Sequence, residues 1–225
     1  MSERKYPVSR KKEYEFRIEK LAFGGAGVTR VDNYVIFVKG AVPGDVVRAR
    51  ITKRKSAYAE ARLLDVLQPS ELRQAPPCRY FPWCGGCTWQ QLSYNDQLRF
   101  KQEIVREAFS HLAGFEDPPV RPIIAAEEPL GYRNKMEFSF SDRRWLLPDE
   151  LGTQHDDRDF ALGLHVPGTF DKIIHVAECL LQPALANRVL TLVASSAREN
   201  GLQPYGIRSH EGFLRFLIIR TSRYN

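Results

Sequence analysis

Short runs in which apolar and polar side chains alternate occupy the first part of the chain. The clearest run covers residues 13–20, where three apolar positions alternate with charged ones, as in a strand with one buried face. Similar runs, separated by turn sequences, predict strands at 34–38, 46–52 and 58–67. Several short strands at this spacing favour a small antiparallel β-barrel of the OB-like type over residues 13–70. Residues 1–12 form a basic arm ahead of the barrel.

Beyond residue 70 the periodicity becomes mixed. An apolar stripe from Leu98 to Leu112, followed by Gly114, predicts a helix that ends at this glycine. A second helix is predicted over 183–200, with a proline at its start. Further strands are predicted at 136–140, 161–165, 172–176 and 213–221. This mixture indicates a central α+β domain over residues 71–225.

Length and composition favour a globular protein. The chain has 225 residues, of which 43% are hydrophobic and 11% aromatic, enough for one or two packed domains. It lacks an apolar run long enough to span a membrane, and its first residues do not resemble a secretory signal. We therefore expect a cytoplasmic monomer with reduced thiols and no membrane partner. Residues 143–159 are polar and are expected to form a loop.

The positive charge is concentrated near the N-terminus. Residues 1–62 hold 15 Lys or Arg against 7 Asp or Glu, whereas the whole chain has a net charge of +6. Such asymmetry favours a polyanionic partner, most simply RNA, although a solvated basic surface gives the same pattern. The candidate RNA-contacting residues are Arg48, Arg50, Lys53, Arg54, Lys55, Arg133 and Lys135.

Three of the four cysteines lie in one loop. Cys78, Cys84 and Cys87 have the spacing C-x5-C-x2-C, and Cys179 follows 92 residues later. Three clustered thiols and one remote thiol indicate a four-thiolate metal site that is completed by folding. Disulfides and a redox C-x-x-C remain alternatives, as does a histidine ligand at His175. The spacing does not distinguish zinc from an iron–sulfur cluster.

Two tryptophans flank the cysteine loop. Trp83 and Trp89 are interpreted as an apolar shell that limits the access of solvent to the metal site. They could alternatively stack on nucleic-acid bases, which we consider the less favoured function.

The order of these features resembles a known enzyme family. A basic barrel with the turn Val42-Pro43-Gly44-Asp45 precedes C-x5-C-x2-C-T-W-Q, the motif Gly-Tyr-Arg-Asn-Lys at 131–135 and a remote Cys-x-x-x-Pro. Together they are similar to RNA uracil-5-methyltransferases that carry an N-terminal TRAM domain and a 4Fe–4S cluster. The resemblance covers nearly all of residues 10–225.

The resemblance implies cofactors and a substrate. It implies a 4Fe–4S cluster held by Cys78, Cys84, Cys87 and Cys179, and an RNA substrate, with 23S ribosomal RNA favoured over tRNA. Members of this family use S-adenosylmethionine to methylate carbon 5 of uracil, and a cysteine thiolate adds to carbon 6 during the reaction.

The assignment of all four cysteines to the cluster leaves no nucleophile in this chain. The predicted strand at 213–221 is followed by four residues only, and no Gly-rich cofactor turn is recognisable. We therefore expect the N-terminal part of such an enzyme, without catalytic residues or an S-adenosylmethionine site, in which the Rossmann-like C-terminal domain is absent. Alone, this part is expected to be inactive.

Two other functions remain open. The chain could be a non-catalytic RNA-binding module that a four-cysteine zinc site stabilises. It could also be a structural iron–sulfur protein without an RNA partner, although the basic first quarter argues against this.

Overall fold

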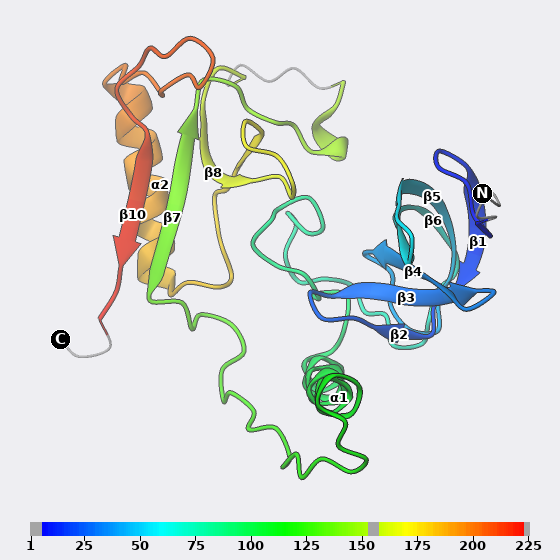
Figure 1. Cartoon of the computed structure of the whole chain (residues 1–225). Helices are drawn as coiled ribbons and strands as arrows, with labels where there is room; N and C mark the ends of the chain where they lie inside the picture. The colour runs from blue at the N-terminus through cyan, green and yellow to red at the C-terminus, as the bar shows by residue number, and fades with distance from the viewer. Residues whose placement is uncertain (1–5, 153–157, 223–225) are drawn as a thin grey trace. The chain divides into compact units, whose positions relative to one another are not determined.

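The computed structural model describes residues 6–152 and 158–222 (Figure 1). The chain divides into two compact units. The first comprises Met1–Pro76 and Thr88–Ala125, and the second comprises Pro77–Cys87 and Ala126–Asn225. The first five residues of the basic arm and the middle of the polar loop at 143–159 lie outside the described residues.

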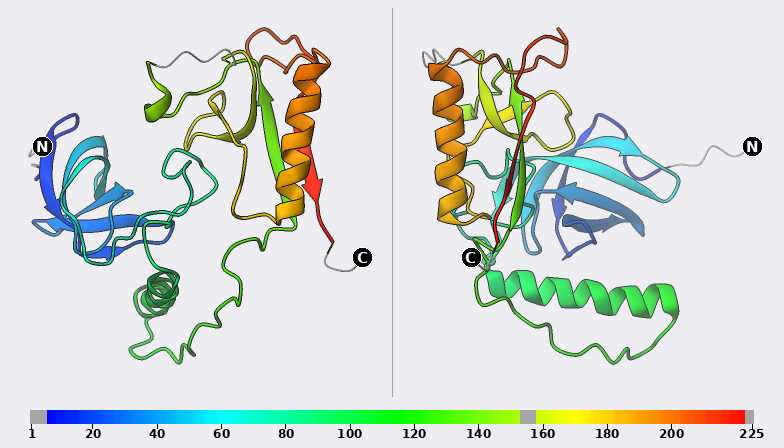
Figure 2. Two further views of the ribbon diagram at one scale, coloured as in Figure 1. Left: turned by 180° about the vertical axis from the view of Figure 1, so that it is seen from behind. Right: turned by 90° about the vertical axis from the view of Figure 1, so that its left-hand side faces the viewer.

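Six strands form the sheet of the first unit. They are β1 (Glu13–Arg17), β2 (Lys20–Leu21), β3 (Ala26–Val31), β4 (Tyr34–Lys39), β5 (Val46–Arg54) and β6 (Tyr58–Gln68), in the spatial order β1-β5-β6-β4-β3-β2. The two edge strands are consecutive in the chain, so the sheet rolls up into a barrel (Figures 1 and 2). Ile18 lies in the chain between β1 and β2 and bonds to the residues before β5: its N–H donates to Asp45 O at 2.9 Å, and Gly44 N–H donates to Ile18 O.

The interior of the barrel follows the alternation in the sequence. Buried positions alternate with more accessible ones along β4 and the first half of β5, which places every second side chain inside the barrel. The main buried residues are Val8, Phe16, Ile18, Tyr34, Ile36, Val38, Ala41, Val47, Ala49, Ile51, Ala59 and Ala61. The strands that the sequence predicted in this region are therefore present.

The antiparallel barrel expected from the sequence is wrong in one respect. Strands β4 and β6 pair in parallel, with Val35 opposite Tyr58 and Lys39 opposite Arg62. Strand β5 lies between them in the sequence but pairs with the far side of β6. Period-two alternation is the same for both pairing directions, so the sequence pattern did not contain this information.

Helix α1 (Tyr94–Ala113) belongs to the first unit, whereas the sequence placed it with the central domain. Asp96 N–H donates to Ser93 Oγ at 3.1 Å, which caps the N-terminus. Gly114 ends the helix with a φ of 73°, in the left-handed region that suits glycine. Phe100 is the buried residue of this helix and packs against Leu21, Val42 and Leu92.

An antiparallel four-stranded sheet and one helix build the second unit. The strands are β7 (Lys135–Ser141), β8 (Ala161–His165), β9 (Ile173–His175) and β10 (Phe216–Arg220), in the order β10-β7-β8-β9. A short 3-10 helix, η1 (Pro148–Glu150), lies between β7 and β8. Helix α2 (Ala184–Glu199) follows Pro183, as predicted, and runs along β10 and β7 (Figures 1 and 2).

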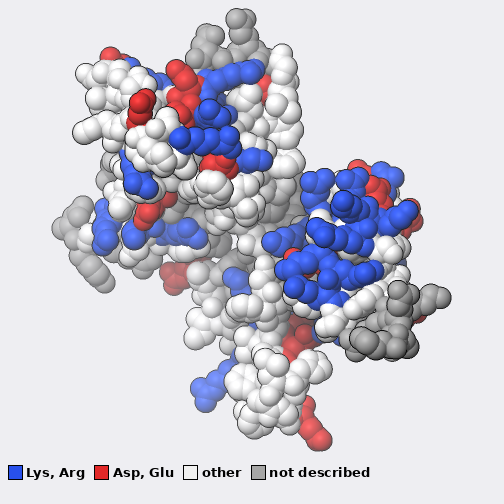
Figure 3. All heavy atoms as spheres, turned by 45° about the horizontal axis from the view of Figure 1, so that its top comes forward, with Lys and Arg blue, Asp and Glu red and all other residues white. Residues whose placement is uncertain are grey.

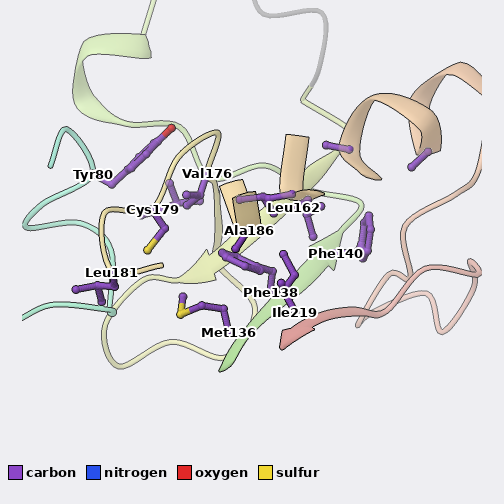
Figure 4. Packing of buried hydrophobic residues seen from close by; sticks show 14 of the residues in the cluster. Tyr80, Met136, Phe138, Phe140, Leu162, Val176, Cys179, Leu181, Ala186 and Ile219 are labelled. Atoms are coloured by element: carbon purple, nitrogen blue, oxygen red, sulfur yellow. The ribbon is translucent and has the colours of Figure 1, made fainter. Parts of the chain in front are cut away.

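The core of the second unit lies between the sheet and α2. Phe138 and Leu162 are fully buried and share this core with the buried alanines of the helix. Figure 4 shows that this core extends to Cys179, Tyr80 and Leu181, at the side where the cysteine loop lies. Among the described residues, no helix is long and apolar enough to cross a membrane.

Candidate functional site

The four cysteines come together in the second unit. Cys179 is a buried member of its core, and Cys78, Cys84 and Cys87 pack against that core. The thiols are also electrostatic neighbours: the pKa of Cys84 responds to the other three, and that of Cys179 responds to Cys78 and Cys87. All four are thiols and none is in a disulfide. Folding thus brings Cys179 to the loop that carries the other three cysteines, although 92 residues separate it from Cys87 in the sequence.

Contacts to the sheet hold the cysteine loop in place. Ala177 N–H donates to Tyr80 Oη at 2.9 Å, which ties the loop to the segment that carries Cys179. Gly85 N–H donates to His165 O at 2.9 Å, so the loop also bonds to the end of β8. A Cβ at Gly85 would lie 2.8 Å from His165 O, and only glycine permits this close approach without a shift.

Asn187, in the first turns of α2, positions Cys179. Its side-chain oxygen accepts from Cys179 N–H at 2.9 Å and from Gln182 Nε2 at 2.6 Å. Its Nδ2 donates to Cys179 O at 3.2 Å. Both main-chain groups of Cys179 are therefore bound to one amide side chain, which fixes the backbone that carries the thiol. Asn187 could not be recognised from the sequence, because its only signal was that of a polar residue in an otherwise apolar helix start.

Burial favours the protonated form of Cys78, Cys84 and Cys179. Loss of solvent raises the pKa of Cys84 to about 11, and the neighbouring thiols add to this rise. Burial likewise raises the pKa values of Cys78 and Cys179. A metal ion stabilises thiolates, so metal uptake by these groups releases protons and becomes weaker as the pH falls.

Main-chain N–H groups partly offset this effect of burial. Gly86 N–H donates to Cys84 Sγ at 3.4 Å. Backbone hydrogen bonds from Tyr80 and Phe81 lower the pKa of Cys78, and one from Leu181 lowers that of Cys179. Hydrogen bonds to sulfur favour the thiolate form and tune the potential of iron–sulfur clusters.

The donor set suits a soft metal centre. Four thiolates are the ligands of structural zinc and of iron–sulfur clusters. Within residues 6–152 and 158–222, however, no three His, Cys, Asp or Glu side chains stand close enough to hold an ion in the present geometry. Binding would therefore draw the sulfurs closer together than they are here. His175 accepts a hydrogen bond from Leu162 N–H through Nδ1, which gives it a role in the sheet.

The two tryptophans occupy different units. Trp83 packs against Trp145 with ring centroids 6.0 Å apart, in the unit that holds the cysteines. Trp89 instead packs with Leu92 and Phe100 in the core of the first unit, and its indole N–H donates to Gly25 O at 3.3 Å. Its expected place in an apolar shell around the cysteines is therefore wrong.

Most predicted RNA-contacting residues of the barrel already have partners. Arg48 pairs with Asp65, Arg50 with Glu13 and Lys53 with Glu60, all between neighbouring strands. These partners reduce the charge that the three cations offer to RNA. Lys55 is exposed on the turn after β5.

The other three candidates also make contacts within their own unit. Arg54 lies 4.4 Å over the ring of Tyr6 and donates to Val8 O. In the second unit Arg133 contacts Met136 Sδ at 3.8 Å. Lys135 Nζ lies 3.8 Å from Glu137 Oε2 on the same strand.

The barrel displays a row of cations of which only Arg50 was predicted from the sequence. Lys39 on β4 lies opposite Arg62 on β6, which lies opposite Arg50 on β5, and Glu13 on β1 completes the row. All four are exposed, and neither Lys39 nor Arg62 forms an ion pair within the described part of the chain. Figure 3 shows Lys and Arg side chains gathered on one face of the barrel.

A family model identifies the barrel. Residues 7–64 match the TRAM domain, so the first unit contains a TRAM domain. The chain is also homologous to curated proteins described as uncharacterized RNA methyltransferases. It is 45% identical to one from Chlorobaculum tepidum over 83% of this chain and 39% of that protein. It is 40% identical to another from Bacteroides thetaiotaomicron, over 90% of this chain and 45% of the relative.

A solved structure shares the fold. The tRNA (uracil-54, C5)-methyltransferase of Pyrococcus abyssi, in complex with S-adenosyl-L-homocysteine, matches with a TM-score of 0.63 and 23% sequence identity. The match covers 94% of this chain and 43% of that enzyme. The chain spans less than half the length of these curated relatives and of this enzyme.

The comparisons correct the predicted fold class on a second point. That prediction counted a Rossmann-like domain as absent and treated the chain as truncated. The similarity to the relatives runs through 83% to 99% of this chain, and the solved fold covers 94% of it. The position at which the chain ends is therefore not evidence for a missing domain, and the fold is defined by the two units described above.

Proposed function

We propose that this chain provides the RNA-binding and iron–sulfur-binding part of an S-adenosylmethionine-dependent RNA uracil-5-methyltransferase. The observation that carries the proposal is the gathering of four thiols in one unit, in a chain that also holds a TRAM domain. The names of the homologous proteins support the RNA methyltransferase class. The proposal places the protein in the cytoplasm, as a monomer that acts on 23S ribosomal RNA.

The chemistry of uracil methylation defines what this chain contributes. Carbon 5 of uracil is a weak nucleophile, so a thiolate must add to carbon 6 and a base must later remove the proton from carbon 5. S-adenosylmethionine would supply the methyl group as a sulfonium. The chain has four cysteines, all assigned to the metal centre. Its own residues therefore bind and orient RNA, and we assign none of them to the nucleophile or to the S-adenosylmethionine site.

The metal centre has a structural role in this proposal. Cys78, Cys84 and Cys87 would join the loop to Cys179, which precedes α2, and so fix the surface around them. Methyl transfer from a sulfonium consumes no electrons, so a redox role is unnecessary. The alternative is a non-catalytic RNA-binding module with zinc on the same four thiolates, which suit either metal.

The metal content tests the proposal directly. Anaerobically purified chain is expected to contain about four iron and four sulfide ions, with a broad absorption band near ~400 nm. One zinc ion without colour would support the alternative. Protein that contains neither metal after reconstitution with iron and sulfide, or with zinc, would contradict both.

The 225-residue chain is expected to transfer no methyl group to RNA by itself. The reason is the absence of a cysteine beyond the four in the metal centre. Incubation with radiolabelled S-adenosylmethionine and 23S ribosomal RNA measures the methyl transfer. The metal-loaded chain is used, because loss of the metal could also abolish activity. Methylation of uridine above the level of a no-protein control would show that one of the four cysteines is a nucleophile and would overturn its assignment.

A further inference from the structure

An aromatic side chain stands in solvent on a tightly held turn of the barrel. Phe23, between β2 and β3, is 93% exposed. Its turn is closed by two hydrogen bonds, from Ala22 N–H to Ala26 O at 2.8 Å and from Gly25 N–H to Ala22 O at 2.9 Å. Gly24 and Gly25 have φ values of 84° and 87°, which a larger residue adopts only with strain.

Residues that follow the cysteine loop also support this turn. Trp89 donates its indole N–H to Gly25 O, and a Cβ at Gly25 would lie 2.3 Å from Trp89 Nε1 and 2.5 Å from Thr88 Cγ2. The backbone that presents Phe23 is therefore fixed by the packed core beneath it. Because this backbone is fixed in advance, only the side chain of Phe23 loses conformational freedom when it binds a flat ligand.

The turn lies at the end of the cation row. It leads into β3 at Ala26, the cross-strand partner of Lys39. Lys39 is in turn opposite Arg62, and neither cation has an ion-pair partner within the described residues. Neighbouring strands of a sheet lie about 4.8 Å apart, so the two cations stand side by side. The exposed Phe23 thus lies on the turn that enters β3, the strand next to the one that carries Lys39.

We propose that Phe23 stacks on an unpaired RNA base while Lys39 and Arg62 bind phosphates of the same single-stranded segment. This inference rests on the proposed RNA-binding function and adds the residues and the form of RNA that the barrel recognises. Stacking platforms combined with a basic track are the usual way to bind single strands. The bases of a continuous duplex are stacked inside the helix, so Phe23 selects loops, bulges and ends.

The test measures the binding of the metal-loaded chain to a fluorescent oligouridine by anisotropy. Phe23→Ala is expected to weaken binding by about 5- to 140-fold, the effect of losing one stacked base. Phe23→Tyr keeps an aromatic ring and is expected to restore most of the affinity. Binding to a blunt RNA duplex is expected to be the same for all three proteins.

The salt dependence separates stacking from charge. Lys39→Gln and Arg62→Gln are each expected to reduce the slope of log K against log salt concentration by about 0.7, whereas Phe23→Ala leaves this slope unchanged. Phe213→Ala is the matched control, because Phe213 is also exposed, at 79%, but lies in the second unit. Its affinity for oligouridine is expected to equal that of the wild type.

The outcomes distinguish a failure of RNA binding as such from a failure of stacking by Phe23. If the wild-type chain binds neither oligouridine nor 23S ribosomal RNA, the RNA-binding function itself fails. If it binds and Phe23→Ala binds equally well, only the stacking role is wrong. Equal weakening of oligouridine and duplex binding by Phe23→Ala, or a matching loss in Phe213→Ala, would also overturn that role.

Discussion

Replacement of Cys179 with serine is expected to abolish stable metal binding and to destabilise the second unit by several kcal/mol. The serine hydroxyl is a hard, protonated donor and does not replace a thiolate on zinc or iron. The structural metal sites of zinc-finger peptides contribute about 10–16 kcal/mol of apparent binding free energy, which is also folding free energy. Iron and sulfide analysis, together with urea unfolding under anaerobic conditions, measures both effects.

Metal-free protein is the control for this experiment. Without metal, Cys179→Ser exchanges one small buried group for another and is expected to change stability by much less than in the loaded protein. The difference between the two unfolding experiments therefore isolates the metal. Loaded Cys179→Ser protein with the iron content and stability of the wild type would show that the fourth ligand is another group.

A variant at Asn187 separates the presence of the thiol from its orientation. Asn187→Ala keeps all four thiols but removes the hydrogen bonds to Cys179 N–H and O. Supporting hydrogen bonds of this kind typically contribute a factor of about 10–100 to metal affinity. We expect metal that binds but is lost faster to a chelator, between the behaviour of the wild type and that of Cys179→Ser.

The helices and strands of this protein were easier to predict than the way in which the strands pair. Alternation along 13–20, 34–38 and 46–52 indicated strands, because each has one face in a core. Helix α2 was recognisable from its proline and its apolar spacing. The direction in which β4 pairs with β6 was not, since pairing is decided by contacts between residues that are distant in sequence.

The candidate RNA-binding surface also could not be predicted without knowledge of the strand pairing. The run of cations at 53–55 is conspicuous in the sequence, yet Lys53 is neutralised by Glu60 across β5 and β6. Lys39 and Arg62 are isolated in the sequence, and the parallel pairing makes them neighbours. A shift of one residue in register would change all of these pairs, so local charge density is a poor guide to the charge that a sheet displays.

The cysteine centre contains residues that the sequence reveals and others that only the folded structure reveals. Its four cysteines were identifiable because thiols are rare and their spacing is restrictive. The residues that position them, Tyr80 and Asn187, carry no comparable signal. Their role depends on hydrogen bonds to the main chain of residues 177–179, and it becomes visible only in the folded structure.

Arg73→Met is expected to destabilise the first unit by about 3–5 kcal/mol, because it leaves a buried carboxylate without its counter-ion. Asp45 is fully buried at the end of the turn that begins at Val42. It accepts from Val42 N–H at 2.8 Å and from Ser70 N–H at 2.9 Å. Arg73 supplies the remaining donors, with Nε and Nη2 each 2.7 Å from a carboxylate oxygen. Arg73 also donates to Gly40 O, so one side chain joins the strand ends to the chain that leaves the barrel.

Arg48→Met provides the matched control. Arg48 also pairs with an aspartate, Asp65, but the two side chains are about half exposed, and such pairs contribute about 0–1 kcal/mol. Hydrogen exchange of the main-chain amides of Val38 and Ala49, measured at increasing urea concentrations, reports the stability of the barrel. Equal losses in the two variants would contradict the role of the buried pair. Combining Arg73→Met with Asp45→Ala is expected to cost less than the sum of the single changes, because the carboxylate that Arg73→Met leaves unpaired is then gone.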